Sequence, residues 1–293
     1  MRTKITLGLL LLMLLPQAVF AAVKYTWGVS GACTGGDANG FGDKCPLSAP
    51  LTTTTAKAYA YSTTYGSGAD TGQLENAYLG SYSGGLGVVN RDGVTATSGC
   101  TSSVDCAEGT PASQLIPEHA MDNNGRYDSI LFSFTDKVNL TAIRIGYPTE
   151  TSPTTCNGVP CDSDITVLAY TGSDTPALAN GVLASGTSFT KATMAGWVLV
   201  GNYADVVTTT SDTVDITSGS TASVPNGSKY WIVAAYDPLW SGGSCTLSCG
   251  NDYVKVLSLS GTGNRVPEPN TILLLSIAAG ATFWGNKRRS RKI

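Results

Sequence analysis

Short segments that alternate between apolar and polar residues, or are apolar throughout, recur along the middle of the chain. They are rich in Val, Ile, Thr and aromatic residues, and clusters of Gly, Asn, Asp, Ser and Pro separate them, as expected for strands and turns. Six such segments cover residues 129–134, 138–146, 165–170, 196–200, 230–235 and 253–259. Outside the two ends of the chain, no window of helical length shows a 3.6-residue period. The pattern predicts an all-β fold, and the strand spacing favours a β-sandwich or jelly roll.

Residues 24–115 are less regular than the rest of the body. Within them, residues 52–61 and 84–90 are the expected strands, with stretches rich in Gly, Ser and Thr between them. The sequence shows neither a repeat of fixed period nor an interdomain linker. We therefore predict three parts: a leader over residues 1–22, one β domain over 23–265 and a tail over 266–293.

Charge is distributed unevenly along the chain. The sequence has 18 Lys and Arg residues against 21 Asp and Glu residues, which gives a formal net charge of −3. Seven of the basic residues and one acidic residue lie in the leader and the tail, so the body has 11 basic against 20 acidic residues, or about −9. Such a surface repels phosphate, and we expect no nucleic acid as a partner.

The leader has the layout of a secretory signal peptide. Arg2 and Lys4 precede an apolar run over residues 5–15, and small residues surround a junction at Ala21 and Ala22. The run is shorter than the roughly 20 residues that a membrane span needs. A buried N-terminal helix is the alternative, but such a helix would carry polar residues on one face. We expect signal peptidase to cut after Ala21 or Ala22.

The tail contains three elements in a fixed order. It opens with Val266, Pro267, Glu268 and Pro269, continues with an apolar run over residues 271–284, and ends in a basic cluster. The two prolines cannot join a helix interior. The apolar segment reaches the lower limit of a membrane span when its polar neighbours are included, and the basic cluster would hold the C-terminus on the cytoplasmic side.

This order of elements resembles the PEP-CTERM sorting signal of exosortase substrates in Gram-negative bacteria. Residues 266–269 match the short signature, Thr271 opens the apolar helix, and the basic end contains Arg288, Arg289 and Arg291. The resemblance implies that the tail holds the precursor transiently in the inner membrane. An exosortase, a membrane-embedded enzyme of transpeptidase type, would then cut near the Pro-Glu-Pro element. A plain C-terminal membrane anchor is the alternative.

Eight cysteines lie between the leader and the tail. They fall in four close pairs: Cys33 with Cys45, Cys100 with Cys106, Cys156 with Cys161, and Cys245 with Cys249. An even number of cysteines in an exported chain argues for disulfides, and local pairing is the simplest of the possible connectivities. Because each pair lies in a loop-like segment, we interpret the bridges as loop staples. A zinc site is disfavoured, since the chain has a single His and no tandem CxxC.

A group of polar residues directly precedes the strand expected from residue 129. Asp122, Asn123 and Asp128 can supply oxygen ligands to Ca²⁺, although their spacing does not match an EF-hand. Alternatively, these side chains bond their own backbone and shape the turn before the strand. A nucleophilic triad that uses His119 is disfavoured, because the chain has no G-x-S-x-G elbow.

Aromatic residues gather near the C-terminal strands: Trp231, Tyr236, Trp240 and Tyr253. If exposed, they would form a platform for sugar binding, whereas aromatic residues in strands usually belong to the core. Alternation along residues 230–235 places the even-numbered side chains on one face of the strand and the odd-numbered side chains on the other.

Three body segments also resemble a group of exosortase-dependent surface proteins: residues 84–90, 117–134 and 162–172. This resemblance implies a surface location rather than a reaction. We therefore predict a non-enzymatic exported protein at the cell surface or in the extracellular matrix, with exopolysaccharide as a candidate partner. The alternative is an adhesion module that depends on carbohydrate or on calcium, the one candidate cofactor. A secreted hydrolase would need two carboxylates about 5 to 10 Å apart across a cleft, and no local motif pairs them.

Overall fold

The computed structural model describes the central part of the chain and leaves out the leader and the tail. The described residues are 23–36, 41–63, 73–90, 119–123, 126–147, 162–176, 178, 187–188, 195–206, 212–218, 220, 224–238, 247 and 252–263. These residues form β-strands and contain no α-helix, so the all-β prediction is confirmed. In this part of the chain, no helix has the length and hydropathy needed to cross a membrane.

Fourteen strands follow one another along the described residues. Their bounds are β1 Lys24–Val29, β2 Lys44–Ser48, β3 Ala56–Thr63, β4 Gln73–Asn76, β5 Tyr78–Tyr82, β6 Gly85–Val89, β7 Met121–Asp122, β8 Ser129–Tyr147, β9 Ile165–Tyr170, β10 Thr187–Ser188, β11 Trp197–Tyr203, β12 Asp212–Asp215, β13 Ser228–Ala235 and β14 Tyr253–Gly263. The segments expected at 165–170 and 84–90 therefore form β9 and β6. The pairings between named strands are all antiparallel.

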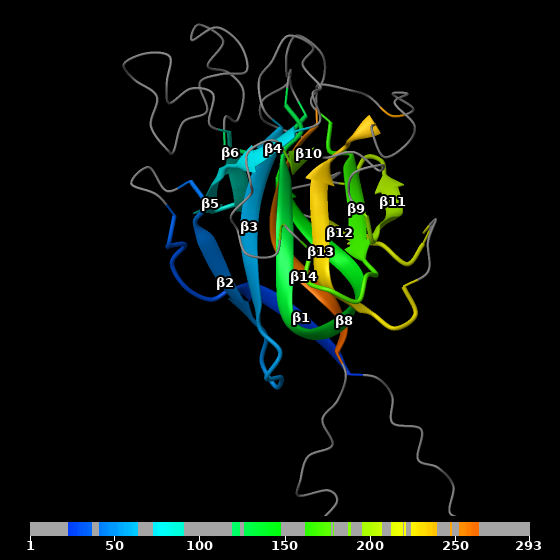
Figure 1. Cartoon of the computed structure of the whole chain (residues 1–293). Coiled ribbons are helices and arrows are strands. Elements are labelled where there is room, and N and C mark those ends of the chain that lie inside the picture. Colours follow the sequence, from blue (N-terminus) through cyan, green and yellow to red (C-terminus); the bar gives the residue numbers. More distant parts are fainter. Residues whose placement is uncertain are drawn as a thin grey trace, which may run out of the picture.

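Strand β8 joins two layers of the sheet, because it runs down one layer, bends and returns along the other (Figure 1). Its first part, from Ser129 to Phe134, pairs with β3 and β13, and its last part, from Val138 onward, pairs with β14 and β12. The segments 129–134 and 138–146 were expected as separate strands. They form one strand because the exposed linking residues 135–137 include neither Gly nor Pro and stay extended.

The core lies between the two layers, and a second apolar cluster covers the opposite face of β13 and its neighbours. Trp231, Val233 and Ala235 belong to the first cluster, whereas Ile232 and Ala234 belong to the second. The alternation expected along residues 230–235 is confirmed. Apolar clusters cover both faces of β13. The middle of this strand is therefore apolar throughout and does not alternate between apolar and polar residues.

The two ends of the described domain lie side by side. Lys24 at the start of β1 pairs with Thr262 near the end of β14, and Figure 1 shows the start of β1 and the end of β14 at the lower end of the domain. The opposite end carries the first residues of β8, β9 and β14 and the last residues of β13. This arrangement separates the chain ends from the site described below.

One of the four expected disulfides lies within the described residues. Cys33 is bonded to Cys45, which lies in β2, and the bridge closes the loop between them. The pairing predicted for these two cysteines is confirmed, and it is the kind of bond that forms in oxidising compartments. The other six cysteines lie outside the described residues.

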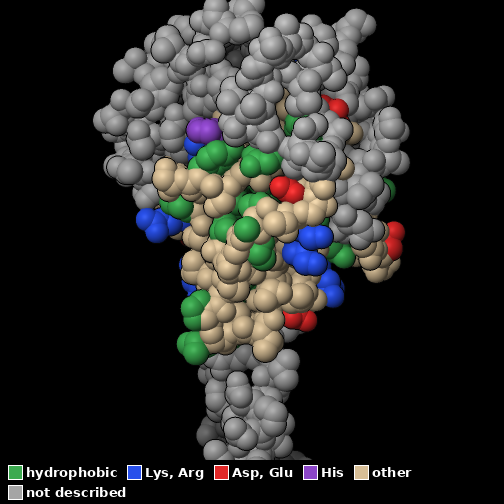
Figure 2. All heavy atoms as spheres, turned by 90° about the vertical axis from the view of Figure 1, so that its left-hand side faces the viewer, with side chains coloured by type: hydrophobic (Ala, Val, Ile, Leu, Met, Phe, Trp, Pro, Cys, Tyr) green, Lys and Arg blue, Asp and Glu red, His purple; other side chains and the backbone are tan. Residues whose placement is uncertain are grey.

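The side of the domain near β2 and β5 carries few charges. Figure 2 shows that described Lys, Arg, Asp and Glu side chains are scattered over this face, with hydrophobic and uncharged side chains between them. This surface agrees with the low overall fraction of charged residues, 13%.

Candidate metal centre

Aspartates gather at the end of the sheet that lies away from the chain ends. Five of them are at most 2% exposed: Asp122, Asp128, Asp164, Asp237 and Asp252. They lie in β7 or next to an end of β8, β9, β13 or β14, and these strand ends meet because neighbouring strands run antiparallel. Buried carboxylates are rare unless they are paired, hydrogen-bonded or bound to a metal ion.

Three aspartates at this end have their carboxylates close together. Carboxylate oxygens of Asp162, Asp164 and Asp205 all lie within 4.8 Å of one another. Asp162 and Asp164 precede β9, and Asp205 follows β11; the pairing of Tyr203 with Ile165 brings these strand ends together. Asp164 is buried, Asp162 is half-buried and Asp205 is exposed, so the cluster opens to solvent on one side.

Backbone hydrogen bonds hold this cluster in place. The Asp205 N–H donates to Oδ1 of Asp164 at 2.7 Å, and the Ser163 N–H donates to Oδ1 of Asp162 at 2.7 Å. Asp205 has a positive φ of 47°, a left-handed conformation that aspartate tolerates better than most residues. The turn after β11 therefore fixes the third carboxylate against the first two.

Burial and mutual repulsion disfavour the ionised form of the carboxylates at this end of the sheet. Burial raises the pKa of Asp164 to about 6, and the Asp162 and Asp205 carboxylates add to the rise. Burial raises the pKa of Asp252 to about 9, again with a contribution from the Asp164 carboxylate. Protons or a bound cation would relieve this repulsion.

The geometry fits a hard divalent cation. Ca²⁺ binds six to eight oxygens at about 2.3–2.6 Å, so two ligands on opposite sides of one ion lie roughly 5 Å apart. The three carboxylates, within 4.8 Å of one another, can therefore surround a single ion. The open side of the cluster leaves room for water as a further ligand.

Asn123, one of the residues predicted to bind calcium, connects its segment to this cluster. Its side-chain amide donates to the carbonyl oxygen of Tyr236 at 3.0 Å and to Oδ2 of Asp252 at 2.5 Å, and its Oδ1 accepts from the Asp252 N–H at 3.0 Å. Oδ1 of Asp252 accepts in turn from the Asp164 N–H at 2.9 Å. Asn123 thus bonds residues far away in the sequence.

The two other residues of that prediction lie beside the same edge. Asp122 is in β7, and its carbonyl oxygen accepts from the Asp128 N–H at 2.9 Å. Asp128 is fully buried, and hydrogen bonding to the Ser62 side chain and to the Asp122 backbone favours its ionised form. Burial, together with the Asp122 carboxylate, raises the pKa of Asp128 well above its usual range. A calcium site at Asp122, Asn123 and Asp128 stays a prediction.

The described aromatic residues of the group near the C-terminal strands belong to the core, as expected for aromatic residues in strands. Trp231 is 2% exposed, and Tyr236 and Tyr253 are fully buried, so none of them offers a ring face to a sugar. The indole N–H of Trp231 donates to the carbonyl oxygen of Ser228 at 3.1 Å, which holds the ring in the core. Trp240 lies outside the described residues.

His119 lies in an aromatic contact rather than in the aspartate cluster. Its ring packs on Tyr82 with centroids 4.3 Å apart, and the Lys255 ammonium lies 4.9 Å from the centroid of the same Tyr82 ring. Burial lowers the pKa of His119, and the charge of Lys255 lowers it further. These contacts account for the position of the imidazole between β5 and β14.

Sequence reasoning missed the three clustered aspartates as a set. The Asp-x-Asp pair at Asp162 and Asp164, directly before the strand at 165–170, was the visible signal. Asp205 could be added only from the pairing of β9 with β11.

Two comparisons with known proteins found no match. No protein-family model matches the chain, and no curated protein matches it at a significant level.

Proposed function

We propose that the chain is the precursor of a non-enzymatic surface or extracellular-matrix protein, exported and then processed at both ends. Signal peptidase would remove the leader, and an exosortase would cut near the Pro-Glu-Pro element of the tail. The observation that carries this proposal is the position of the chain ends. Since Lys24 pairs with Thr262, the first and the last described strands meet at the boundaries expected for the leader and the tail.

The bounds of the outer strands suit such processing. β1 begins at Lys24, after the expected cut at Ala21 or Ala22, and β14 ends at Gly263, before Pro267. Removal of both segments would leave every described strand and the core intact. The Cys33–Cys45 bridge agrees with folding outside the cytoplasm.

The experiment that tests this proposal is to recover the protein from the cell surface and determine where its chain begins and ends. We expect a chain that begins at Ala22 or Val23 and lacks the apolar part of the tail. Surface protein that retains the tail up to Ile293 would contradict the processing step.

The aspartate cluster favours a second function, that of a calcium-dependent domain. In this case Asp162, Asp164 and Asp205 would bind Ca²⁺ at the end of the domain that faces away from the membrane while the tail is anchored. The ion would offset both the burial of the Asp164 carboxylate and the repulsion from Asp162 and Asp205, which together raise its pKa. Calcium would then stabilise the turn after β11 and the start of β9.

Calcium is expected to raise the melting temperature of the purified protein. Binding to the folded state alone contributes RT ln(1 + [L]/Kd), which is about 2.7 kcal/mol at a hundredfold excess over Kd. Asp205→Asn should abolish this increase. It should also leave the calcium-free protein at least as stable as the wild type, since it removes one of three close carboxylates. Thermal unfolding with CaCl₂ and with EDTA measures both effects.

Asp43→Asn is the matched control for that substitution. Asp43 lies in the loop before β2 and accepts from the Gly36 N–H at 2.7 Å, a bond that an asparagine oxygen can keep. This variant should respond to calcium as the wild type does. A melting temperature that is the same in CaCl₂ and EDTA would rule out calcium binding at the cluster.

A further inference from the structure

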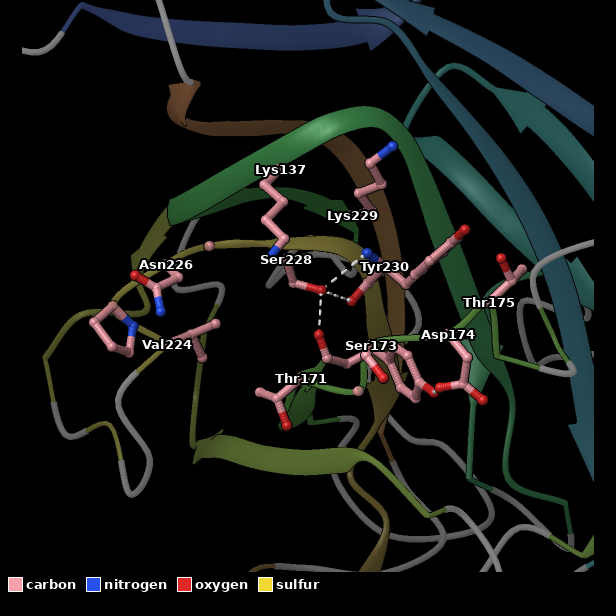
Figure 3. A pocket seen from close by; sticks show the side chains of 14 residues that line it. Lys137, Thr171, Ser173, Asp174, Thr175, Val224, Asn226, Ser228, Lys229 and Tyr230 are labelled. Carbon is pink, nitrogen blue, oxygen red and sulfur yellow. Dashed lines mark hydrogen bonds between the residues drawn. The ribbon is translucent and has the colours of Figure 1, made fainter.

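A pocket of about 460 Å³ lies at the other end of the domain, near the start of β1 and the end of β14 (Figure 3). Three segments form it: Lys137 in the bend of β8, Tyr170 at the end of β9 with residues 171–175 after it, and residues 224–227 with the start of β13. Val138, next to Lys137, pairs with both Ser228 and Gly263, which places the pocket near the end of β14. Its volume falls within the range of about 300–1,000 Å³ typical of small-ligand sites.

The floor of the pocket is held by hydrogen bonds and ring contacts. The Ser228 hydroxyl donates to the carbonyl oxygen of Tyr170 at 2.6 Å and accepts from the Tyr230 N–H at 3.0 Å. The Tyr170 ring lies 5.4 Å from the Trp197 ring and 6.0 Å from the Tyr230 ring, and its hydroxyl donates to Asp174. A ligand would therefore meet a surface that is already ordered, which lowers the entropic cost of binding.

The polar groups around the pocket comprise positively charged, negatively charged and neutral side chains. Figure 3 shows that the Lys137 ammonium points toward the pocket and that Lys229 points away from it. The Tyr170 hydroxyl lowers the pKa of Asp174, so this carboxylate is ionised at neutral pH. Hydroxyl and amide groups along the rim supply donors and acceptors: Thr171, Ser173, Thr175 and Asn226.

We propose that this pocket binds one unit of an acidic polysaccharide, with the sugar carboxylate on Lys137, the sugar ring against Tyr230, and sugar hydroxyls turned toward Asp174, which lies across the pocket from Lys137 (Figure 3). Charge-assisted bonds to a carboxylate are stronger than neutral ones, and the half-buried Tyr230 ring offers apolar surface beside hydrogen-bonding groups. A small inorganic anion would use Lys137 alone, and a neutral sugar would use Tyr230 and the rim alone. The proposed surface location would bring the domain to such polymers, but the binding itself requires neither the leader nor the tail.

The test is calorimetric titration of the full chain, kept soluble in a mild detergent, with three probes. These are a tetramer of galacturonic acid, the neutral maltotetraose, and inorganic phosphate. We expect saturable binding of the acidic tetramer, with at least tenfold weaker binding of maltotetraose and of phosphate. Lys137→Ala should weaken binding of the acidic tetramer about tenfold or more, because it removes a charge-assisted hydrogen bond. Tyr230→Phe should retain binding, since it keeps the ring.

Lys57→Ala is the control for the loss of one positive charge, because Lys57 is exposed on β3 and does not line the pocket. It should bind the acidic tetramer as the wild type does, and the melting temperatures should show that all variants are folded. Failure of the acidic tetramer to bind, equal binding of all three probes, or equal weakening by Lys57→Ala and Lys137→Ala would each overturn the proposal. Export and tail processing would be unaffected by any of these results.

Discussion

A chain that lacks residues 266–293 is expected to be exported and then released, instead of being held in the inner membrane. The apolar run and the basic end of the tail are the only part of the chain after the leader that is predicted to span the bilayer. Because β14 ends at Gly263, the folded domain should keep its stability within about 0.5 kcal/mol. Immunoblots of membrane, surface and medium fractions measure the change, and we expect the membrane-held precursor to disappear and the protein to be found in the medium.

Replacing Pro267 and Pro269 by alanine separates anchoring from processing. This variant keeps the apolar run and the arginines, but it loses the short signature that the resemblance assigns to the exosortase. We expect it to stay uncut in the inner membrane. If it is cut and sorted as the wild type is, the Pro-Glu-Pro element is not the recognition signal.

Asn123→Ala is expected to lower the free energy of unfolding by about 3 kcal/mol or more. The amide of Asn123 bonds the carbonyl oxygen of Tyr236 and both the N–H and the carboxylate of Asp252, and all of these groups are buried. Each buried polar group that loses its partner costs about 1–3 kcal/mol. Urea-induced unfolding, followed by tryptophan fluorescence, gives the difference directly.

Asn226→Ala provides the matched control, because Asn226 is exposed in the turn before β13. Its free energy of unfolding should stay within about 0.5 kcal/mol of the wild type. Equal stability of Asn123→Ala and the wild type would show that the bonds between β7, β14 and Tyr236 do not hold this end of the sheet together.

The strands that could be predicted from the sequence are those with a strong local pattern. Residues 165–170 form β9 with the expected bounds, and the two faces of residues 230–235 separate as alternation requires. Strands with a weak pattern were missed. β12 has the sequence DTVD, which is half acidic, and β2 contains Pro46, a residue that is usually confined to edges of a sheet.

Contacts between distant segments could not be predicted, because nothing in a local pattern specifies them. The bend of β8 brings Val138 beside Gly263 and Ser228, and this creates the pocket that contains Lys137. The pairing of β9 with β11 brings Asp205 to Asp164 in the same way. The predicted calcium segment was close to this acidic edge, but its Asn123 turned out to bond Asp252 across the sheet.

The most direct test of the account is the intact mass of the protein recovered from the cell surface and from the medium. The full chain has a mass of 30.2 kDa. We predict a smaller mass, which corresponds to a chain that begins at Ala22 or Val23 and ends near the Pro-Glu-Pro element, with its cysteines oxidised in pairs. A surface protein that retains the full mass, or whose cysteines are all reduced, would contradict the proposed export and processing.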